Sequence, residues 1–286
     1  MSDQGNSNPS VRMPETPTGV LFLVSWIGER VIGMLGHIGA VLLLFVDAVG
    51  WVARSFYQPK VRIGRSAIVS QIIRIGVRSI GIVSLVSGCV GLILAFQLAP
   101  PLDDFGQRDK VANIVGVAVL RELGPLIAAI VLTGFAGASI AAEIGTMVVG
   151  EEIEALEACA MNPVKFLVVP RVIASILSLT AISVIADVVS VAAALGISML
   201  ALDIPYAAFM TNLTDQVKLV DFLTGVSKGA VFGMLIAIIA CYNGLKVTGG
   251  AMGVGIATTG TVVQAVVAVI ISDLVFTTIF YALKLV

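Results

Sequence analysis

Charged side chains are scarce in this sequence. Only 12% of its 286 residues are Asp, Glu, Lys or Arg, and 58% are hydrophobic, whereas a soluble domain is roughly a quarter charged and half apolar. A single histidine, His37, and three scattered cysteines without a CxxC pair exclude a His-based metal site or a Ser-His-Asp triad within one chain. The composition favours an integral membrane protein over a soluble enzyme.

Nucleotide-binding motifs are also missing. No GKS or GKT of a Walker motif occurs anywhere, and the run GGAMGVGIATTG at 249–260 has no preceding strand and no acid at dinucleotide-binding spacing. We interpret this run as flexible or tightly packed loop backbone. The net charge of −1 gives no general basic surface for nucleic acid. If the chain pumps a substrate, the energy must come from hydrolysis on another subunit.

Long apolar runs are what the sequence has instead, and they lack the period-2 alternation of a membrane barrel. They predict an all-α integral membrane protein. The expected spanning helices lie at about 79–98, 111–132, 166–202, 220–243 and 261–283.

The N-terminal part differs in character from these runs. Residues 1–17 are polar and predict a disordered cytosolic tail, whereas 18–57 are apolar but punctuated by charges. The second pattern predicts an amphipathic helix in the headgroup plane rather than a span. Residues 58–286 then form the five-span domain. A basic cluster just before the first span places that side in the cytoplasm, and it consists of Lys60, Arg62, Arg65, Arg74 and Arg78.

With this orientation, the segments between spans can be assigned to sides of the membrane. Residues 100–110 and 202–218 are expected to be external, and residues 134–165 and 244–260 are expected to be cytoplasmic loops. The final span leaves almost no C-terminal tail.

An acidic stretch, GEEIEALEACAMNPVKF, lies between the second and third spans. It predicts a short cytoplasmic helix at about 150–162, with glutamates in the first turn, where the helix dipole favours them, and Asn162-Pro163 at its end. An anionic leaflet would repel these carboxylates, so a protein partner with a complementary groove is favoured over the membrane surface. The residues expected to form the contact are Glu151, Glu152, Ile153, Glu154, Leu156 and Glu157.

Charges inside the spans are costly in lipid, about 2.5–3.5 kcal/mol each at the bilayer centre. Arg121 and Glu122 stand out because Gly124-Pro125 follows at once, which predicts a helix kink with polarity at the widened point. Adjacent side chains point about 100° apart, so at least one of the two should face a partner helix or an aqueous cavity. We expect Lys228 and Glu143 to snorkel from span ends.

Two further acids lie deeper in the spans. Asp187 and Asp273 have serines nearby in the sequence and are expected to be packed polar contacts.

The segment RELGPLIAAIVLTGFAGASIAAEIGTMVVGEEIEALEACAMNPVKFLVVPR, at 121–171, resembles the central signature of the MlaE/YrbE permease family. These permeases belong to ABC transporters that move phospholipids between the inner and outer membranes of bacteria with double envelopes. YNGLKVTGGAMGVGIATTGTVV, at 242–263, resembles the family's second signature. Many members have basic residues where this chain has Phe135, Gly260 and Val148-Val149. This chain therefore lacks the side chains with which those basic residues would contact lipid headgroups or the ATPase.

The resemblance implies a homodimeric permease without a cofactor of its own, served by a cytoplasmic ABC ATPase that binds ATP and Mg²⁺. It makes the acidic helix the coupling helix, and adds a periplasmic MCE-domain protein and a small STAS-type accessory protein as partners. It also implies a lipid cavity in the dimer between the first, second and fifth spans. The residues that the resemblance places near this cavity are Gln97, Leu98, Phe105, Arg121, Glu122 and Leu123.

The function expected on these grounds is that of a permease subunit of an ATP-driven phospholipid transporter. The expected location is the bacterial inner membrane, with the N-terminus cytoplasmic. The alternative is a proton-coupled secondary transporter or channel that uses Arg121, Glu122, Asp187 and Asp273 as a charge path and works without nucleotide. The absence of an internal repeat and the acidic helix count against it. A passive membrane anchor is a third reading.

Overall fold

The computed structural model of this chain describes residues 20–57 and 64–284, so the tail predicted at 1–17 lies outside the described residues. The described residues are almost entirely helical and contain no strand, which confirms the all-α class. The chain divides into two units between Leu43 and Leu44.

The division falls inside the first helix, α1 (Val20–Tyr57). Its segment Ser25–Arg54 is long and apolar enough to cross a membrane, so the described residues contain six helices with this property rather than the expected five. Length and composition do not distinguish a span from a helix lying in the interface. The interfacial position of α1 stays a prediction.

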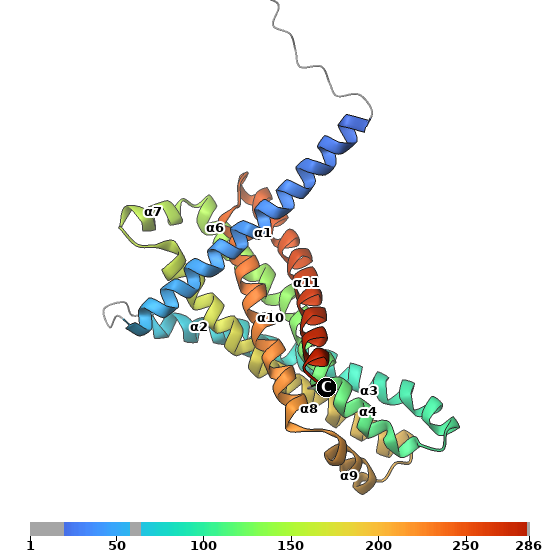
Figure 1. Ribbon diagram of the computed structural model, residues 1–286. Coiled ribbons are helices and arrows are strands. Elements are labelled where there is room, and N and C mark those ends of the chain that lie inside the picture. The colour runs from blue at the N-terminus through green and yellow to red at the C-terminus, as the bar shows by residue number, and fades with distance from the viewer. Residues whose placement is uncertain (1–19, 58–63, 285–286) are drawn as a thin grey trace, which may run out of the picture. The chain divides into compact units, whose positions relative to one another are not determined.

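The second unit contains the remaining helices (Figure 1). Short 3₁₀ turns at Val77–Ser79 and Arg108–Lys110 precede α3 and α4. The α-helices are α2 (Arg65–Ile75), α3 (Ile80–Asp104), α4 (Val111–Ala118), α5 (Gly124–Leu132), α6 (Ala138–Val149), α7 (Glu152–Ala158), α8 (Val169–Ala201), α9 (Tyr206–Gln216), α10 (Leu219–Leu245) and α11 (Gly250–Ala282).

Three π-helical segments connect some of these helices without interrupting them. They are η3 (Val119–Leu123), η4 (Thr133–Gly137) and η5 (Val164–Val168). The first two join α4, α5 and α6 into one helical path, and the third leads directly into α8.

Two expected cytoplasmic loops are wrong in extent. The segment 134–165 is helical as far as Val149, and the glycine-rich run enters α11 at Gly250, so only a short connection follows α10. In lipid each backbone amide must be paired within the chain, which keeps glycine-rich stretches helical. Within the segments expected to be external, α3 continues to Asp104 and α9 occupies most of 202–218, and their side of the membrane stays a prediction.

Close packing of backbones explains much of the glycine and serine content. A side chain at Gly91 of α3 would overlap the carbonyl of Ser190 on α8, and one at Gly233 of α10 would meet the carbonyl of Ser175, also on α8. The Ser190 hydroxyl donates a hydrogen bond of 2.8 Å to the Ser87 carbonyl across the first contact. Small residues thus hold α3 and α10 against α8, as in other membrane helix bundles.

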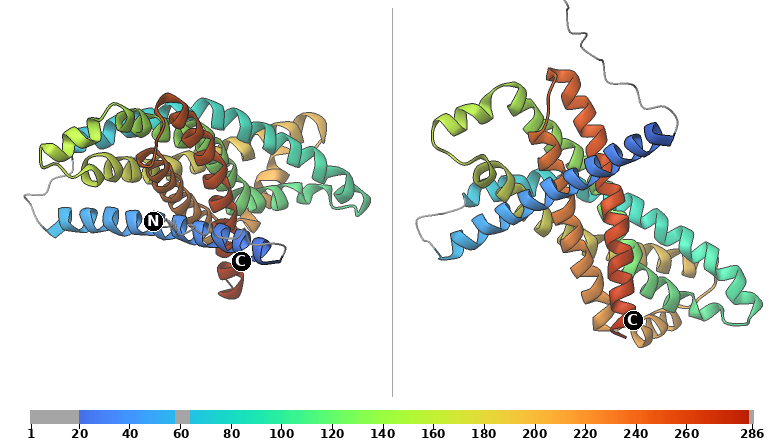
Figure 2. Two further views of the ribbon diagram at one scale, coloured as in Figure 1. Left: turned by 90° about the horizontal axis from the view of Figure 1, so that it is seen from above. Right: turned by 45° about the horizontal axis from the view of Figure 1, so that its top comes forward.

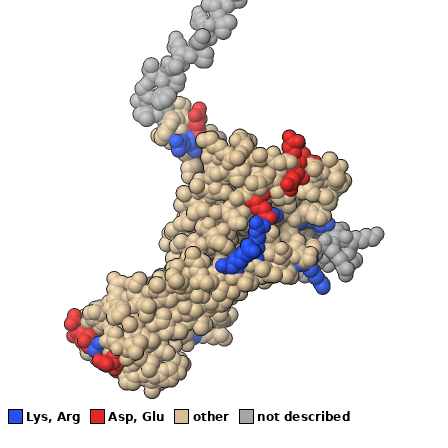
Figure 3. Space-filling model, turned by 180° about the vertical axis from the view of Figure 1, so that it is seen from behind, with Lys and Arg blue, Asp and Glu red and all other residues tan. Residues whose placement is uncertain are grey.

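The outer surface is mainly apolar. Helix α11 lies beside α10 in both views of Figure 2 and exposes large side chains such as Met252, Leu274 and Tyr281. On the face in Figure 3, Lys, Arg, Asp and Glu gather in separate groups, and broad uncharged areas lie between them. This distribution fits a surface covered by lipid or by other membrane helices.

The α3–α8 contact can be tested with a matched pair of glycines. Gly91→Ala places a methyl group against the Ser190 carbonyl and should destabilise the fold by about 1–3 kcal/mol, the usual range for overpacking. Gly81→Ala on the same helix meets nothing within 4 Å and should leave stability unchanged or slightly higher. Thermal unfolding in detergent, followed by circular dichroism, measures both. Equal midpoints for the two variants would contradict the close contact.

Candidate functional site

The predicted kink at Gly124-Pro125 takes the form of a π turn rather than a break. The Gly124 amide donates its hydrogen bond to the Val119 carbonyl, five residues back. Pro125 has no amide hydrogen, and it lies at the start of α5, just after this wider turn. Such π bulges are rare and occur frequently at functional sites. The helix therefore continues, but its width changes at Arg121 and Glu122.

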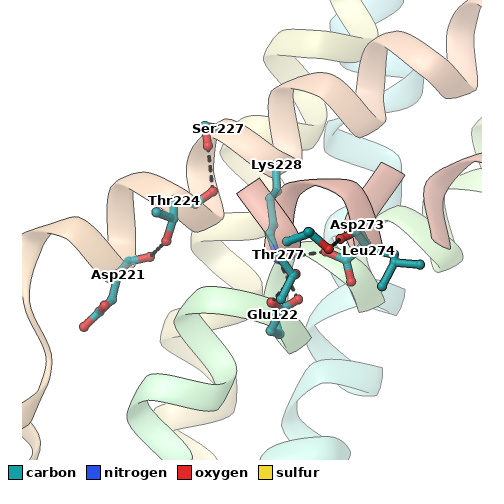
Figure 4. Close-up of polar contacts among 9 residues, drawn as sticks. Glu122, Asp221, Thr224, Ser227, Lys228, Asp273, Leu274 and Thr277 are labelled. Carbon is teal, nitrogen blue, oxygen red and sulfur yellow. Dashed lines mark hydrogen bonds and ion pairs between the residues drawn. The ribbon is translucent and has the colours of Figure 1, made fainter. Parts of the chain in front are cut away.

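Both charged residues in this turn reach across to α10. Arg121 Nε lies 2.6 Å from Asp221 Oδ1, and Glu122 Oε2 lies 2.6 Å from Lys228 Nζ. Lys228 Nζ is also 2.8 Å from Asp273 Oδ1 on α11. The expectation that at least one of the adjacent pair faces another helix is confirmed for both. We call Arg121, Glu122, Asp221, Lys228 and Asp273 the ion-pair array (Figure 4 shows its Glu122–Lys228–Asp273 part).

A hydroxyl completes the array on α11. Thr277 Oγ1 donates a hydrogen bond of 2.8 Å to Glu122 Oε1 and accepts one of 3.0 Å from Lys228 Nζ. The ammonium of Lys228 thus faces two carboxylates and one hydroxyl, which matches its three donors. Three segments, η3, α10 and α11, meet at this one nitrogen (Figure 4).

Burial in the array is uneven. The side chains of Lys228 and Asp221 are each 1% exposed, whereas those of Arg121 and Glu122 are 23% and 35% exposed. Each buried charge therefore has a partner that also reaches the molecular surface. A molecule at this surface could contact the Glu122 carboxylate or the Arg121 guanidinium without entering the core.

The expectation that Lys228 snorkels from a span end is wrong, and the expectation for Glu143 stays a prediction. Lys228 is buried and paired, and Glu143 bridges two arginines, with Arg74 Nη1 at 2.7 Å and Arg171 Nη2 at 3.2 Å. Position along a helix predicts depth in the membrane, but it does not predict which helix packs against that face. Both residues join helices together.

Asp187 is buried beside the π turn, but the polar contact expected for it is not found among the described residues. Its Oδ1 has no hydrogen-bond partner among the described residues, and a side chain at Gly124 would overlap this atom. The nearby Ser183 and Ser190 hydroxyls donate to backbone carbonyls instead. Gly124 is therefore required at this position for the approach of α8, in addition to any effect on helix shape.

The other expected cavity residues are less clearly connected to the array. Leu98 packs against the buried cluster that contains Val115 and Phe209, and Leu123 is half-buried in the π turn. Gln97 and Phe105 are exposed, and in the described part of the chain no hydrogen bond or ion pair joins Gln97 to the array. Their place in a lipid cavity stays a prediction.

The acidic helix is present but shorter than predicted. Helix α7 ends at Ala158, because Ala160 adopts a left-handed conformation, and not at Asn162-Pro163. Ile153 and Leu156 are half-buried. The carboxylates are all exposed and available to a partner, namely those of Glu151, Glu152, Glu154 and Glu157.

Sequence reasoning missed Asp221 and Thr277, and it misjudged Lys228. A signal was present on α10, because Asp221, Gly225 and Lys228 recur at four- and three-residue spacing and therefore share one helix face. Thr277 carried no comparable signal, since hydroxyls are common in membrane helices.

This chain is similar to known proteins over most of its length. Residues 68–279 match the family described as Permease MlaE. A probable ABC transporter permease protein of Rickettsia felis is 34% identical over 262 residues, covering 92% of this chain and 99% of the relative. One from Synechocystis is 36% identical over 212 residues, covering 74% and 81%. The Arabidopsis thaliana protein TRIGALACTOSYLDIACYLGLYCEROL 1, chloroplastic, is 33% identical over 211 residues, covering 74% and 60%.

The match covers the π turn, the acidic helix and every member of the ion-pair array. Together with the length and apolar character of the helices, it makes this chain a multi-pass membrane protein of the transporter permease type. The chain belongs to the MlaE permease family.

Proposed function

We propose that this chain is the membrane subunit of an ATP-driven phospholipid transporter, and that the ion-pair array borders the path of the lipid headgroup. The observation that carries the proposal is the half-exposed Glu122 carboxylate paired with the fully buried Lys228 ammonium. A lipid site needs mostly apolar walls with a few polar groups, and the array supplies those groups within an apolar helix bundle.

The chemistry of the array fits a headgroup that carries charges of both signs. A phosphate can approach the Arg121 guanidinium, and an ammonium can approach the Glu122 carboxylate, because both side chains are partly exposed. The name of the Arabidopsis relative contains that of a diacylglycerol lipid, which supports a lipid substrate. Transport would run between the inner and outer membranes of a bacterium, with the cytoplasmic N-terminus on the ATPase side.

Energy would come from a partner, since the relatives are named as ABC transporter permeases. We propose that two copies of the chain form the complex and that the ATPase, with its ATP and Mg²⁺, docks on α7. The exposed carboxylates of α7 support this docking surface. A periplasmic MCE-domain protein and a STAS-type protein complete the proposed assembly.

Reconstitution into liposomes with the ATPase partner tests the proposal directly. Transfer of labelled phospholipid should require ATP and should stop when the ATPase is inactive. Transfer of protons or ions without nucleotide, with no lipid movement, would instead favour the secondary-transporter alternative.

Removing the buried ammonium should destabilise the array. Lys228→Gln leaves Glu122 and Asp273 facing each other without a cation, which should cost about 3–5 kcal/mol, as for other broken buried pairs. The double variant Lys228→Gln/Asp273→Asn should recover much of this loss, because fewer unpaired charges remain. Thermal unfolding of wild type, both single variants and the double variant gives the coupling energy. Additive effects would contradict the pairing.

Another array variant, Glu122→Gln, can separate a structural role from transport. In Glu122→Gln, Lys228 keeps Asp273 and Thr277 as partners, so folding should survive. Lipid transfer should fall by roughly tenfold or more if the carboxylate contacts the headgroup, as expected for loss of a charge-assisted hydrogen bond. Thr224→Val on α10, whose hydroxyl donates only to a backbone carbonyl, is the control. Unchanged transfer in Glu122→Gln would remove the array from the lipid path.

The acidic helix should be required for ATPase docking. Replacing the glutamates at 151, 152, 154 and 157 with glutamine removes four exposed negative charges and should abolish co-purification of the ATPase. The matched control is Asp103→Asn/Asp104→Asn, which removes exposed charges at the C-terminal end of α3. Retention of the ATPase by the α7 variant would show that docking depends on another surface.

A further inference from the structure

A second polar cluster lies away from the ion-pair array. Arg74, at the end of α2, pairs with Glu143 of α6, which also pairs with Arg171 of α8. Arg78, in the turn after α2, lines a cavity together with Arg74 and Glu143. Two of these three arginines pair with the one carboxylate, so the cluster carries two positive charges in excess. No ion pair is formed by Arg78 within residues 20–57 and 64–284.

A cavity of about 230 Å³ opens beside this cluster. Its polar lining comes from Gln71, Arg74, Arg78, Ser139 and Glu143. Its volume is below the roughly 300–1,000 Å³ of a typical small-molecule pocket, and suits a group of headgroup size. A second cavity of about 370 Å³ shares Arg74 and Arg78 and is lined as well by Ser70 and Ile73.

The polar lining is incompletely paired. The Gln71 side-chain oxygen is buried and has no hydrogen-bond partner among the described residues. A buried amide oxygen left unpaired is costly. The arginines in turn require an acceptor anion, for which phosphate matches guanidinium geometry well.

The apolar lining indicates what is attached to the anion. Phe135 is 41% exposed and Ile73 is 52% exposed, and both line these cavities. An inorganic anion gains nothing from such surfaces, whereas the acyl chains of a lipid do. Basic pockets between membrane helices on the cytoplasmic side are suited to anionic lipid headgroups.

This cavity is separate from the ion-pair array. Its lining residues Phe135 and Glu143 lie 13 and 21 residues beyond Glu122 on the same helical path. At about 1.5 Å per residue, this places them about 20–30 Å from it. The cavity lies at the end of that path which leads to α7.

We propose that the cavity lined by Gln71, Arg74, Arg78 and Ser139 binds an anionic phosphate group. The phosphate is carried either by a membrane phospholipid or by a free ion, and the apolar rim favours the lipid. The site does not depend on the transport path proposed above, because none of its residues belongs to the array.

Site-specific photocross-linking tests this proposal. The full chain with p-benzoylphenylalanine in place of Phe135 is reconstituted in nanodiscs of phosphatidylcholine with or without phosphatidylglycerol, irradiated, and analysed by mass spectrometry. We expect a cross-link to phosphatidylglycerol, with at least tenfold lower yield in Arg78→Gln. Arg65→Gln, which changes an exposed arginine on α2 outside both cavities, should keep the full yield.

A second measurement distinguishes the two sources of phosphate. Broadening of the ³¹P signal of inorganic phosphate by the detergent-solubilised protein, lost in Arg78→Gln, without a lipid cross-link would support the site with a free ion as its ligand. Three outcomes would overturn the proposal. They are equal cross-linking to both lipids, equal cross-linking yields in Arg78→Gln and Arg65→Gln, and the absence of both cross-linking and broadening. Circular dichroism confirms that both variants are folded before these comparisons.

Discussion

The structure depends most on the ammonium of Lys228, which is buried among membrane helices and must be paired there. Its partners, Glu122 and Asp273, come from η3 and α11, so satisfying one charge fixes three segments of the second unit relative to one another. The neighbouring Arg121–Asp221 pair adds a second contact to α10, seven residues earlier in that helix. This is two helical turns, or about 10.5 Å. Two adjacent residues in one helix can reach both partners because their long side chains diverge and the π turn widens the helix between them.

The other two π turns, like η3, lie next to polar parts of this chain. Phe135, in η4, lines the arginine cavity, and η5 follows the acidic helix and leads into α8. A π turn carries one extra residue within a helix and is a place where the register can shift without loss of backbone pairing. Points where the register can shift therefore lie on both helical paths from α7. One path runs through η5 to α8, and the other runs through η4 and η3 to the array. Movement at α7 could reach the array along these helices without unfolding either one.

The sequence predicts the fold class, the acidic helix and a contact of Arg121 or Glu122 with another helix, because each depends on local composition or spacing. It fails where tertiary packing decides. The glycine-rich run before Thr261 reads as a loop in isolation but is helical in a bundle that needs small residues at its contacts. The sequence gives the position of Lys228 along α10 but not its partners on other helices. It therefore predicts a residue near a span end. In the sequence Gly124 indicates a helix kink, whereas in the structure its main constraint is the Asp187 carboxylate packed against it.

The two polar clusters also differ in charge, and this difference bears on what each can bind. The array holds three carboxylates against two cations, whereas the arginine cluster holds three cations against one carboxylate. A purely anionic phosphate group is therefore attracted to the arginine cavity and, on net charge, disfavoured at the array. A headgroup with both a phosphate and a cation can be accepted at the array, because its cation offsets the excess carboxylate charge while its phosphate approaches Arg121. One helical path thus offers two polar sites with opposite charge preferences, separated by most of its apolar length.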